Sequence, residues 1–418
     1  MPANRRDFLT AFGAFAAAGS FGWHSASPST AYAADEKEQE DDRGDDGPAS
    51  LFLTWQGDPT TSVVVQWVGE EDENAEVRFG VRKKSFDGSA RAKIKPFPGT
   101  DLKVHRCELT GLAPGEEYEF TLGKTGPKHR FRTMPAKAND VIHFVSGGDA
   151  GTGSAALENN RLAAKQEPYF ALIGGDLAYD NGASPKTFLK FLENYGTTMI
   201  DPEGRCIPML SCLGNHEVQG GYGATRDKGA SYFSVFDGFY SDTTYGVFDV
   251  GDYLSLVLLD TNHVTPVAGE QTDWLEKTLS DRQDRPHLIV ANHVPAYPSH
   301  RDFEKAGADN RKHWSPLFER YDVDVVLEHH DHTYKRTHPM KDGMVDANGV
   351  LYLGDGSWGK IRPVTSPEKR PYLARASEAY HIAVHRLEGD RRFHVALEET
   401  GKVADVCMTA GKRPAKRG

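Results

Sequence analysis

Apolar and polar positions follow two different patterns on either side of residue 135. Between residues 50 and 135, short segments of alternating apolar and polar side chains are separated by turn residues at regular intervals. Such alternation is typical of half-buried strands, and a series of them predicts a β-sandwich over residues 50–135. The predicted strands are residues 61–68, 76–79, 104–109, 118–122 and 130–133.

Beyond residue 135, apolar runs alternate with amphipathic helical segments. The apolar runs are residues 141–145, 169–173, 207–213, 253–259, 287–291 and 323–327. The helical segments include residues 154–167, 185–195, 271–282 and 311–321. This alternation predicts an α/β domain with sheets packed between helices over residues 136–400, followed by a basic tail over residues 401–418. The predicted fold class is therefore α/β, with an N-terminal β-sandwich domain.

Residues 1–34 differ in composition from the rest of the chain. Arg5 and Arg6 precede a long apolar run and then a small-residue triplet at residues 31–33, an order that predicts a cleavable signal peptide and no transmembrane segment. Residues 4–10 resemble a twin-arginine signal, which implies the twin-arginine export machinery as a partner and a periplasmic or secreted location. An ordinary secretion signal is the alternative.

Residues 35–49 predict a disordered acidic spacer, because eight acids there are accompanied by only Lys37 and Arg43. The whole chain has a formal net charge of −11, from 49 basic and 60 acidic residues. A surface of this sign does not attract a phosphate backbone, so we expect no nucleic acid partner. The four cysteines include no C-x-x-C pair, and we predict that all are unpaired. No sequence feature indicates an oligomeric state.

Residues that bind metals follow five of the six apolar runs. In an open α/β sheet, ligands bind beyond the carboxyl ends of the strands, so we expect these residues to converge. Each segment alone is more often a turn or a hydrogen-bonded histidine, whereas the ordered set indicates a metal centre. The segments are Gly147-Gly148-Asp149-Ala150-Gly151, Gly174-Gly175-Asp176-Leu177-Ala178-Tyr179, Gly214-Asn215-His216-Glu217, Asn292-His293-Val294-Pro295 and His329-His330-Asp331-His332.

The residue types in these segments suit a pair of cations. Two cations held about 3.5 to 4 Å apart need a bridging carboxylate, further carboxylate, imidazole and amide ligands, and an open face for water and substrate. The glycines beside the aspartates are expected to leave room for a phosphate-sized group. Because paired cations activate a bound water and shield phosphoryl oxygens, the set predicts hydrolysis of a phosphate ester.

On these motifs, residues 141–385 resemble the metallophosphoesterase superfamily with its calcineurin-like fold, and within it the purple acid phosphatases, whose large members carry a preceding β-sandwich. Two features select the subfamily. Asp149 lacks the histidine that ordinary members carry two residues later, and Tyr179 stands three residues after Asp176, where purple acid phosphatases have a tyrosinate iron ligand.

The resemblance implies two metal sites that share one aspartate. The first site would bind Fe(III), and its ligands would be Asp149, Asp176, Tyr179 and His332. The second site would bind Zn, Mn or Fe(II), and its ligands would be the shared Asp176, Asn215, His293 and His330.

The resemblance also implies catalytic roles outside the ligand set. His216 would contact the phosphoryl group and assist the leaving oxygen, and His300 is a candidate acid or substrate contact, with an exposed loop histidine as the alternative. Where the family usually has Gly, this chain has His329, which we expect to crowd the second metal or to contact substrate.

Two further residues near the motifs are given structural roles. We expect Trp358 to pack in the interior, and Arg336 to be a solvated strand-end arginine, with pairing to the substrate phosphate as its alternative.

The leading hypothesis is an exported acid phosphatase that hydrolyses phosphomonoesters with metal-bound hydroxide as the nucleophile. A second hypothesis keeps the metals and makes the protein a phosphodiesterase or a phospholipase-type enzyme. A third makes the β-sandwich, whose residues 109–118 resemble the corner of a fibronectin type III domain, a binding module beside an inert α/β domain.

Overall fold

The computed structural model describes residue 48, residues 50–137 and residues 141–411. The expected signal peptide at residues 1–34 and all of the expected spacer except residue 48 lie outside this part of the chain. Within the described residues, no helix combines the length and the apolar character that a membrane crossing requires. All four cysteines lie within them and are free, as predicted.

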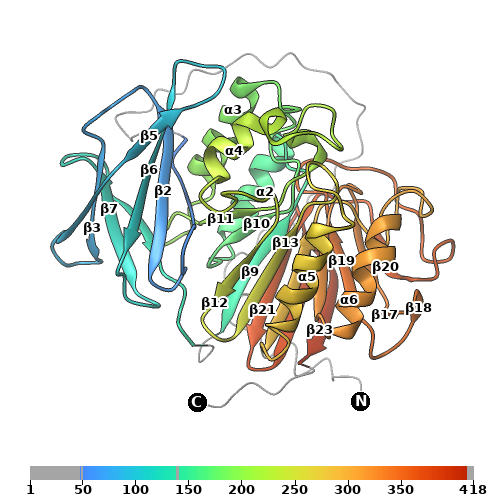
Figure 1. Ribbon diagram of the computed structural model, residues 1–418. Coiled ribbons are helices and arrows are strands. Elements are labelled where there is room, and N and C mark those ends of the chain that lie inside the picture. Colours follow the sequence, from blue (N-terminus) through green and yellow to red (C-terminus); the bar gives the residue numbers. More distant parts are fainter. Residues whose placement is uncertain (1–47, 49, 138–140, 412–418) are drawn as a thin grey trace, which may run out of the picture. The chain divides into compact units, whose positions relative to one another are not determined.

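Two four-stranded antiparallel sheets form the N-terminal β-sandwich (Figure 1). One sheet has the order β1-β2-β6-β5, with β1 Phe52–Thr54, β2 Ser62–Gly69, β6 Lys103–Thr110 and β5 Lys93–Pro96. The other has the order β4-β3-β7-β8, with β4 Gly88–Arg91, β3 Glu76–Val81, β7 Glu117–Leu122 and β8 His129–Arg132. Apolar side chains of both sheets, such as Val65 and Phe120, share one core. The predicted sandwich is confirmed, and Tyr118 Oη accepts the N–H of Ala113 at 2.8 Å, as in a tyrosine corner.

Two larger sheets form the α/β domain. A six-stranded sheet has the order β11-β10-β9-β21-β22-β23, with β11 Met209–Ser211, β10 Ala171–Ile173, β9 Ile142–Gly147, β21 His381–Glu388, β22 Arg391–Glu398 and β23 Val403–Ala410. A seven-stranded sheet has the order β12-β13-β14-β15-β19-β16-β20, with β12 Gly246–Val250, β13 Leu254–Leu259, β14 His287–Asn292, β15 Val325–Glu328, β19 Leu351–Asp355, β16 Tyr334–Thr337 and β20 Leu373–Ser377. The strands β9 to β11 are parallel to one another, as are β13, β14, β15 and β19. The carboxyl ends of neighbouring parallel strands therefore lie together.

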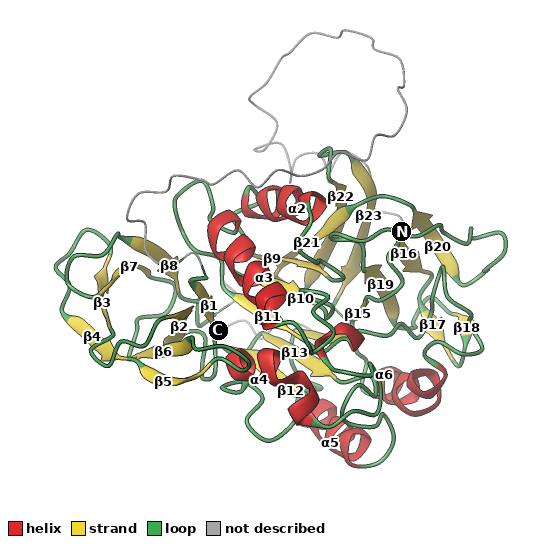
Figure 2. Cartoon of the chain, turned by 90° about the horizontal axis from the view of Figure 1, so that it is seen from above, coloured by secondary structure: helices red, strands yellow, loops and turns green. Residues whose placement is uncertain are grey.

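Helices cover these sheets on two sides (Figure 2). The helices α2 and α3 lie on one side, and α5 and α6 lie on the other. Leu275 of α5 and Phe318 of α6 pack into one core with Val290 of β14 and Val326 of β15. The helices are α2 Ser154–Ala164, α3 Pro185–Thr198, α4 Ala230–Phe236, α5 Glu270–Ser280 and α6 Ser315–Arg320, and a hairpin of β17 Met340–Lys341 and β18 Met344–Val345 follows β16.

The C-terminal strands correct the predicted boundary at residue 400. We expected a tail over residues 401–418, but β23 pairs with β22 along Val403–Ala410. This strand lies at the edge of its sheet. It contains exposed apolar residues such as Val403 as well as the buried Asp405, so its sequence does not show the apolar pattern by which a strand is predicted. Asp405 pairs with Arg336 Nε at 2.6 Å, and the Arg336 side chain is largely buried, which corrects the expectation of a solvated strand-end arginine. Its guanidinium is engaged with Asp405 and not with a phosphate site.

Polar contacts join the β-sandwich to the α/β domain. Thr54 of β1 donates to the carbonyl of Met209 in β11 at 2.8 Å. The largest cluster surrounds Arg205, which lies just before β11 and pairs with Asp201 at 2.6 Å, Glu117 at 2.7 Å and Glu167 at 3.0 Å. Since the side chain of Arg205 is 10% exposed and that of Asp201 is 1% exposed, the pair is shielded from solvent.

We expect Arg205→Ala to lower the free energy of unfolding by about 3 kcal/mol, because it leaves the buried carboxylate of Asp201 without its cation. Urea unfolding monitored by circular dichroism measures the change. Arg161→Ala is the matched control, since Arg161 pairs with Glu158 on an exposed helix face and its loss changes stability by about 0.5 kcal/mol or less. Equal effects of the two substitutions would contradict the structural importance of the Arg205 cluster.

Candidate metal centre

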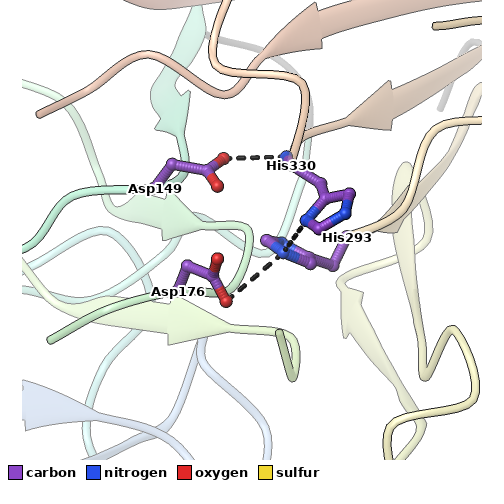
Figure 3. Close-up of side chains that lie close together, drawn as sticks. All are labelled: Asp149, Asp176, His293 and His330. Atoms are coloured by element: carbon purple, nitrogen blue, oxygen red, sulfur yellow. Dashed lines mark hydrogen bonds and ion pairs between the residues drawn. The ribbon is translucent and has the colours of Figure 1, made fainter. Parts of the chain in front are cut away.

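The predicted ligands lie at the carboxyl ends of strands from both sheets (Figure 3). Asp149 follows β9 and Asp176 follows β10 of the six-stranded sheet, whereas His293 follows β14 and His330 follows β15 of the seven-stranded sheet. One side-chain atom from each of these four buried residues lies within 4.8 Å of the others. Residues far apart in the sequence therefore converge on one point.

The backbone is strained at five of the predicted ligands. Asp149, Asp176, Tyr179, His330 and His332 all have φ between 55° and 65°, the left-handed region that non-glycine residues rarely occupy. Each such conformation costs roughly 1 kcal/mol and persists only where its surroundings enforce it. Strain of this kind clusters at functional sites. The left-handed conformation gives each of these side chains a direction that differs from the one at the end of a regular strand.

Three of the predicted ligands form one group. His332 Nε2 lies 2.9 Å from Asp149 Oδ1 and 3.0 Å from Tyr179 Oη, and Tyr179 Oη lies 3.3 Å from Asp149 Oδ1. The geometry thus brings together an imidazole nitrogen, a carboxylate oxygen and a phenolic oxygen. Burial, together with the carboxylates of Asp149 and Asp176, raises the pKa of Tyr179 far above its ordinary value, so the phenol keeps its proton unless a strong cation displaces it.

The remaining ligands surround His293. Its Nε2 atom lies 3.3 Å from Asp176 Oδ1, 3.2 Å from Asn215 Oδ1 and 3.1 Å from His330 Nδ1. Its Nδ1 atom lies 2.8 Å from the carbonyl of Gly174, which can only accept, so Nδ1 carries the proton of the neutral ring. The lone pair of Nε2 then faces two oxygens and a nitrogen, an arrangement that a cation satisfies.

The pKa values of the ligands in the ion-free site also indicate that positive charge is favoured there. Burial alone would lower the pKa of His293, but the Asp176 carboxylate raises it to about 9. The pKa of Asp176 is held below its usual range, since the His293 imidazole outweighs the effect of burial. Burial and the neighbouring His293 lower the pKa of His330. The site therefore favours one positive charge next to Asp176 even when no ion is bound.

The donor set fits a pair of cations. Asp176 Oδ2 is buried without a hydrogen-bond partner, while Oδ1 faces His293 and accepts the backbone N–H of His216 at 2.8 Å. A buried carboxylate oxygen without a hydrogen-bond partner is costly, and Asp176 lies in one cluster with Asp149 of the first group and with His293 and His330 of the second. Phenolate and carboxylate donors favour a hard ion in the first group, and imidazole and amide donors favour a softer ion in the second.

Glu217 is a positioning residue that the sequence analysis did not assign. Its carboxylate accepts the backbone N–H groups of Asp176 at 2.8 Å, Leu177 at 2.7 Å and Gly214 at 2.8 Å. It thereby fixes the loop after β10 against the loop after β11, which carries Asn215. Its place three residues after Gly214 has the spacing of a helix-capping acid, and that spacing could have identified it.

The glycines of the motifs do not leave the space that we expected for a phosphate. A Cβ atom at Gly175, whose φ is +90°, would lie 2.6 Å from His293 Nδ1, and one at Gly214 would collide with Asp176 Oδ1. These two glycines therefore allow the ligands themselves to approach one another.

The two predicted catalytic histidines lie outside the four-residue cluster. His216 is partly exposed, its ring centroid lies 4.3 Å from that of Tyr179, and its Nε2 lies 3.9 Å from Asp176 Oδ2. His300 is farther out: its Nδ1 bonds the carbonyl of Pro363 at 2.8 Å, and the residue lines a cavity beside His330.

His329 corrects a further expectation. It is fully buried, and its Nε2 pairs with Asp355 at 2.6 Å while its Nδ1 lies 3.0 Å from the carbonyl of Asn292. It therefore points away from the ligand cluster, and it neither crowds a metal position nor reaches substrate. Trp358 packs as expected, because it is fully buried and its indole N–H donates to Asn160 at 2.8 Å.

Comparisons with known proteins agree with this geometry. Residues 139–334 match the family model described as calcineurin-like phosphoesterase, and residues 48–133 match the model of the purple acid phosphatase N-terminal domain. Purple acid phosphatase 21 of Arabidopsis thaliana is 26% identical over 309 residues, which cover 71% of this chain and 68% of that protein. Acid phosphatase type 7 of Homo sapiens is 24% identical over 405 residues, which cover 86% of this chain and 90% of that protein.

A solved structure resembles the fold over both domains. The purple acid phosphatase PPD1 from yellow lupin seeds superposes with a TM-score of 0.71 at 18% identity, covering 86% of this chain and 74% of that one. The chain spans 63% of the length of another relative, an uncharacterized protein of Mycobacterium tuberculosis that is 26% identical over 342 residues and matches 70% of this chain.

The fold and the matched catalytic domain define a calcineurin-like metallophosphoesterase, a metal-dependent phosphoric ester hydrolase. The chain thus combines a calcineurin-like metallophosphoesterase domain with a purple acid phosphatase N-terminal domain, and its relatives include purple acid phosphatases. That family implies a dinuclear metal centre, and the cluster of Asp149, Asp176, His293 and His330 is where the chain can hold one.

Asp176→Asn tests the shared carboxylate. We expect metal-loaded wild-type protein to retain about two ions per chain and the variant to retain fewer than one, because Asn keeps the shape and tolerates the positive φ but lacks the charge. Elemental analysis after removal of free metal gives the stoichiometry. Asp252→Asn, at an exposed turn, is the matched control and keeps the wild-type content. Two ions retained by the Asp176 variant would rule out the bridge.

Proposed function

We propose that this protein is an exported acid phosphatase that hydrolyses phosphomonoesters at a dinuclear centre. The observation that carries the proposal is the proximity of two groups of electronegative atoms, one containing a phenol and one containing two imidazoles. The buried cluster of Asp149, Asp176, His293 and His330, whose ligand atoms lie within 4.8 Å of one another, joins the two groups. The names of the relatives, a purple acid phosphatase and an acid phosphatase, support the monoester activity.

We assign the ligands as two sets that share Asp176. The first set would hold Fe(III) and comprises Asp149, Asp176, Tyr179 and His332, and the second would hold Zn, Mn or Fe(II) and comprises Asp176, Asn215, His293 and His330. When bound, the pair of cations supplies an activated water and charge stabilisation for the phosphoryl oxygens.

The chain's own residues orient the reaction around that pair. Glu217 holds the loops of Asp176 and Asn215 in register through three backbone N–H groups. His216 is partly exposed and close to Asp176, and a contact with Asn181 at its Nδ1 orients the ring. We assign His216 to the phosphoryl group and the leaving oxygen, to which its imidazole delivers a proton as the ester P–O bond breaks. His300, at the rim, takes no part in this assignment.

The N-terminal residues support export. Residues 1–34 carry the paired Arg5 and Arg6 before an apolar run and a small-residue triplet. We propose release through the twin-arginine route, which exports proteins already folded and suits a domain whose metal ligands come together only in the folded chain.

Initial rates on a phosphate monoester and on the diester of the same aryl alcohol test the monoester assignment. We expect the kcat/KM of the metal-loaded protein to be at least about 100-fold higher for the monoester, a difference of about 2.7 kcal/mol. A faster diester reaction would overturn the assignment in favour of a phosphodiesterase or phospholipase-type enzyme.

Tyr179→Phe tests the iron assignment. The iron-loaded wild-type protein should absorb visible light through tyrosinate-to-Fe(III) charge transfer, and the variant should lose that band while its far-ultraviolet circular dichroism stays unchanged, because only the phenolic oxygen is removed. Absorption spectra of both proteins at equal iron content compare the intensity of this band. A colourless, iron-loaded wild-type protein, or a band that survives in the variant, would remove Tyr179 from the ligand set.

His216→Asn tests the proton-delivering group. The variant should lose at least about 100-fold in kcat, the usual contribution of a positioned acid or base, and should keep the wild-type metal content because His216 is no ligand in our assignment. Steady-state kinetics and elemental analysis on the same sample separate the two effects. A variant with wild-type kcat would contradict the assigned role.

A further inference from the structure

A cavity of about 580 Å³ opens directly beside His330. Its volume falls in the range of pockets that bind small organic molecules. The ends of β13, β14 and β15 form its inner side, and the segment over residues 300–310 forms its outer side. The lining residues include Tyr222, Thr261, Asn262, Val267, Val294 and Ala308. Since His330 belongs both to the metal cluster and to this lining, the cavity adjoins the proposed catalytic centre.

Tyr222 lines the cavity and contacts His330 of the metal cluster. Its hydroxyl lies 3.2 Å from His330 Nε2, its ring meets that of His330 edge-on at 6.4 Å, and its other neighbour is the buried ring of His263 at 4.9 Å. Despite these contacts, Tyr222 remains 46% exposed. A rigid aromatic ring therefore presents open surface to the cavity.

Backbone hydrogen bonds hold Tyr222 in this place. The N–H of Gly223 donates to the carbonyl of Asn262 at 2.8 Å, and the N–H of Ala224 donates to that of His263 at 2.9 Å. Gly221 and Gly223, on either side of the tyrosine, have φ of +79° and +60°, which lets the loop turn sharply at this point. The ring is thus pre-positioned in the bare protein.

The opposite wall is equally well anchored. The carboxylate of Asp331 accepts the backbone N–H groups of Ser299, His300 and Arg301, the last two at 2.7 and 2.9 Å. The guanidinium of Arg301 donates to the carbonyl of His330 at 3.0 and 2.8 Å, which ties this wall to the metal cluster. The cavity is therefore bounded by fixed elements on both sides.

The chemistry of the lining suits an uncharged ring with polar edges. The exposed ring of Tyr222 offers a stacking surface, and the partly exposed Asn262 offers an amide, whereas Thr261, Val267 and Val294 are buried in the wall. The charged residues of the lining are of both signs, namely Arg301 and Lys305 against Asp302 and Asp309, so the cavity offers little net charge to a second anionic group.

We propose that this cavity receives the leaving group of the substrate, and that the substrate class is a phosphomonoester whose alcohol carries an uncharged planar ring with hydrogen-bonding edges, such as a nucleoside. The proposal rests on the phosphatase function proposed above. In the reaction the water oxygen bonds to phosphorus, the ester P–O bond breaks, and the leaving oxygen takes a proton. The products are orthophosphate and the free alcohol, which remains in the cavity until it dissociates.

Filling the cavity tests the proposal. Ala308→Trp places a bulky ring inside it, at a residue that is exposed and therefore tolerant of size. We expect the ratio of kcat/KM for adenosine 5′-monophosphate to that for glycerol 1-phosphate to fall about tenfold, which corresponds to about 1.4 kcal/mol. Ala347→Trp, in an exposed turn between β18 and β19, is the matched control and leaves this ratio at the wild-type value.

Tyr222 provides a second, independent pair of variants. Tyr222→Phe keeps the stacking surface and should hold the ratio within about twofold of wild type, whereas Tyr222→Leu should lower it about three- to tenfold, the usual value of an aromatic stack. Both are measured at saturating metal with elemental analysis, because the hydroxyl also contacts His330. Equal ratios in Phe and Leu variants, or a ratio that Ala308→Trp does not change, would overturn the proposal.

Binding of free adenosine separates this proposal from the proposed function. Titration calorimetry on the metal-loaded protein should detect adenosine binding in the wild type and at least tenfold weaker binding in the Ala308→Trp variant. If no monoester is hydrolysed but adenosine binds in this way, the phosphatase function fails and the binding site stands. If both monoesters are hydrolysed but adenosine does not bind, the function stands and the leaving-group site fails.

Discussion

The need for positive charge between buried electronegative atoms is the constraint on which the rest of the structure depends. His293 Nε2 lies 3.1 to 3.3 Å from atoms of Asp176, Asn215 and His330, and Asp176 Oδ2 has no hydrogen-bond partner. In the absence of a cation, this arrangement is unfavourable because each atom has been taken out of water without a full set of donors. The remainder of the fold must hold these atoms together until an ion binds.

The fold meets this requirement with backbone geometry and buried carboxylates. Five predicted ligands occupy the left-handed region, and Glu217 fixes two of their loops through three N–H groups. The two sheets supply the rigid strand ends from which the loops start. Local strain at the centre is therefore offset by the apolar packing of strands and helices around it, as in the core shared by α5, α6, β14 and β15.

The local sequence was enough to predict the strands that precede the site and the residues that converge there, because each ligand lies within a few residues of a strongly apolar strand. It was not enough for contacts made across the fold. The direction of His329 depends on Asp355, and the partner of Arg336 is Asp405, 69 residues away in an edge strand without a clear pattern. Tyr222 escaped notice for the same reason, since only the folded chain brings its hydroxyl to His330.

The role of the glycines also depends on contacts across the fold that the local sequence does not predict. Their positions beside the ligands were evident, but the neighbour that each one accommodates was not, because that neighbour comes from another strand. At Gly175 it is His293 from the other sheet. A residue's conformational freedom can thus be read from its type, whereas the reason for that freedom is tertiary.

The most direct test of the central claim is a crystal structure of metal-loaded protein with anomalous scattering recorded at the metal absorption edges. We predict two anomalous peaks about 3.5 to 4 Å apart, with an Asp176 oxygen about 2.0 to 2.2 Å from each. A single peak, or two peaks of which Asp176 contacts only one, would contradict it.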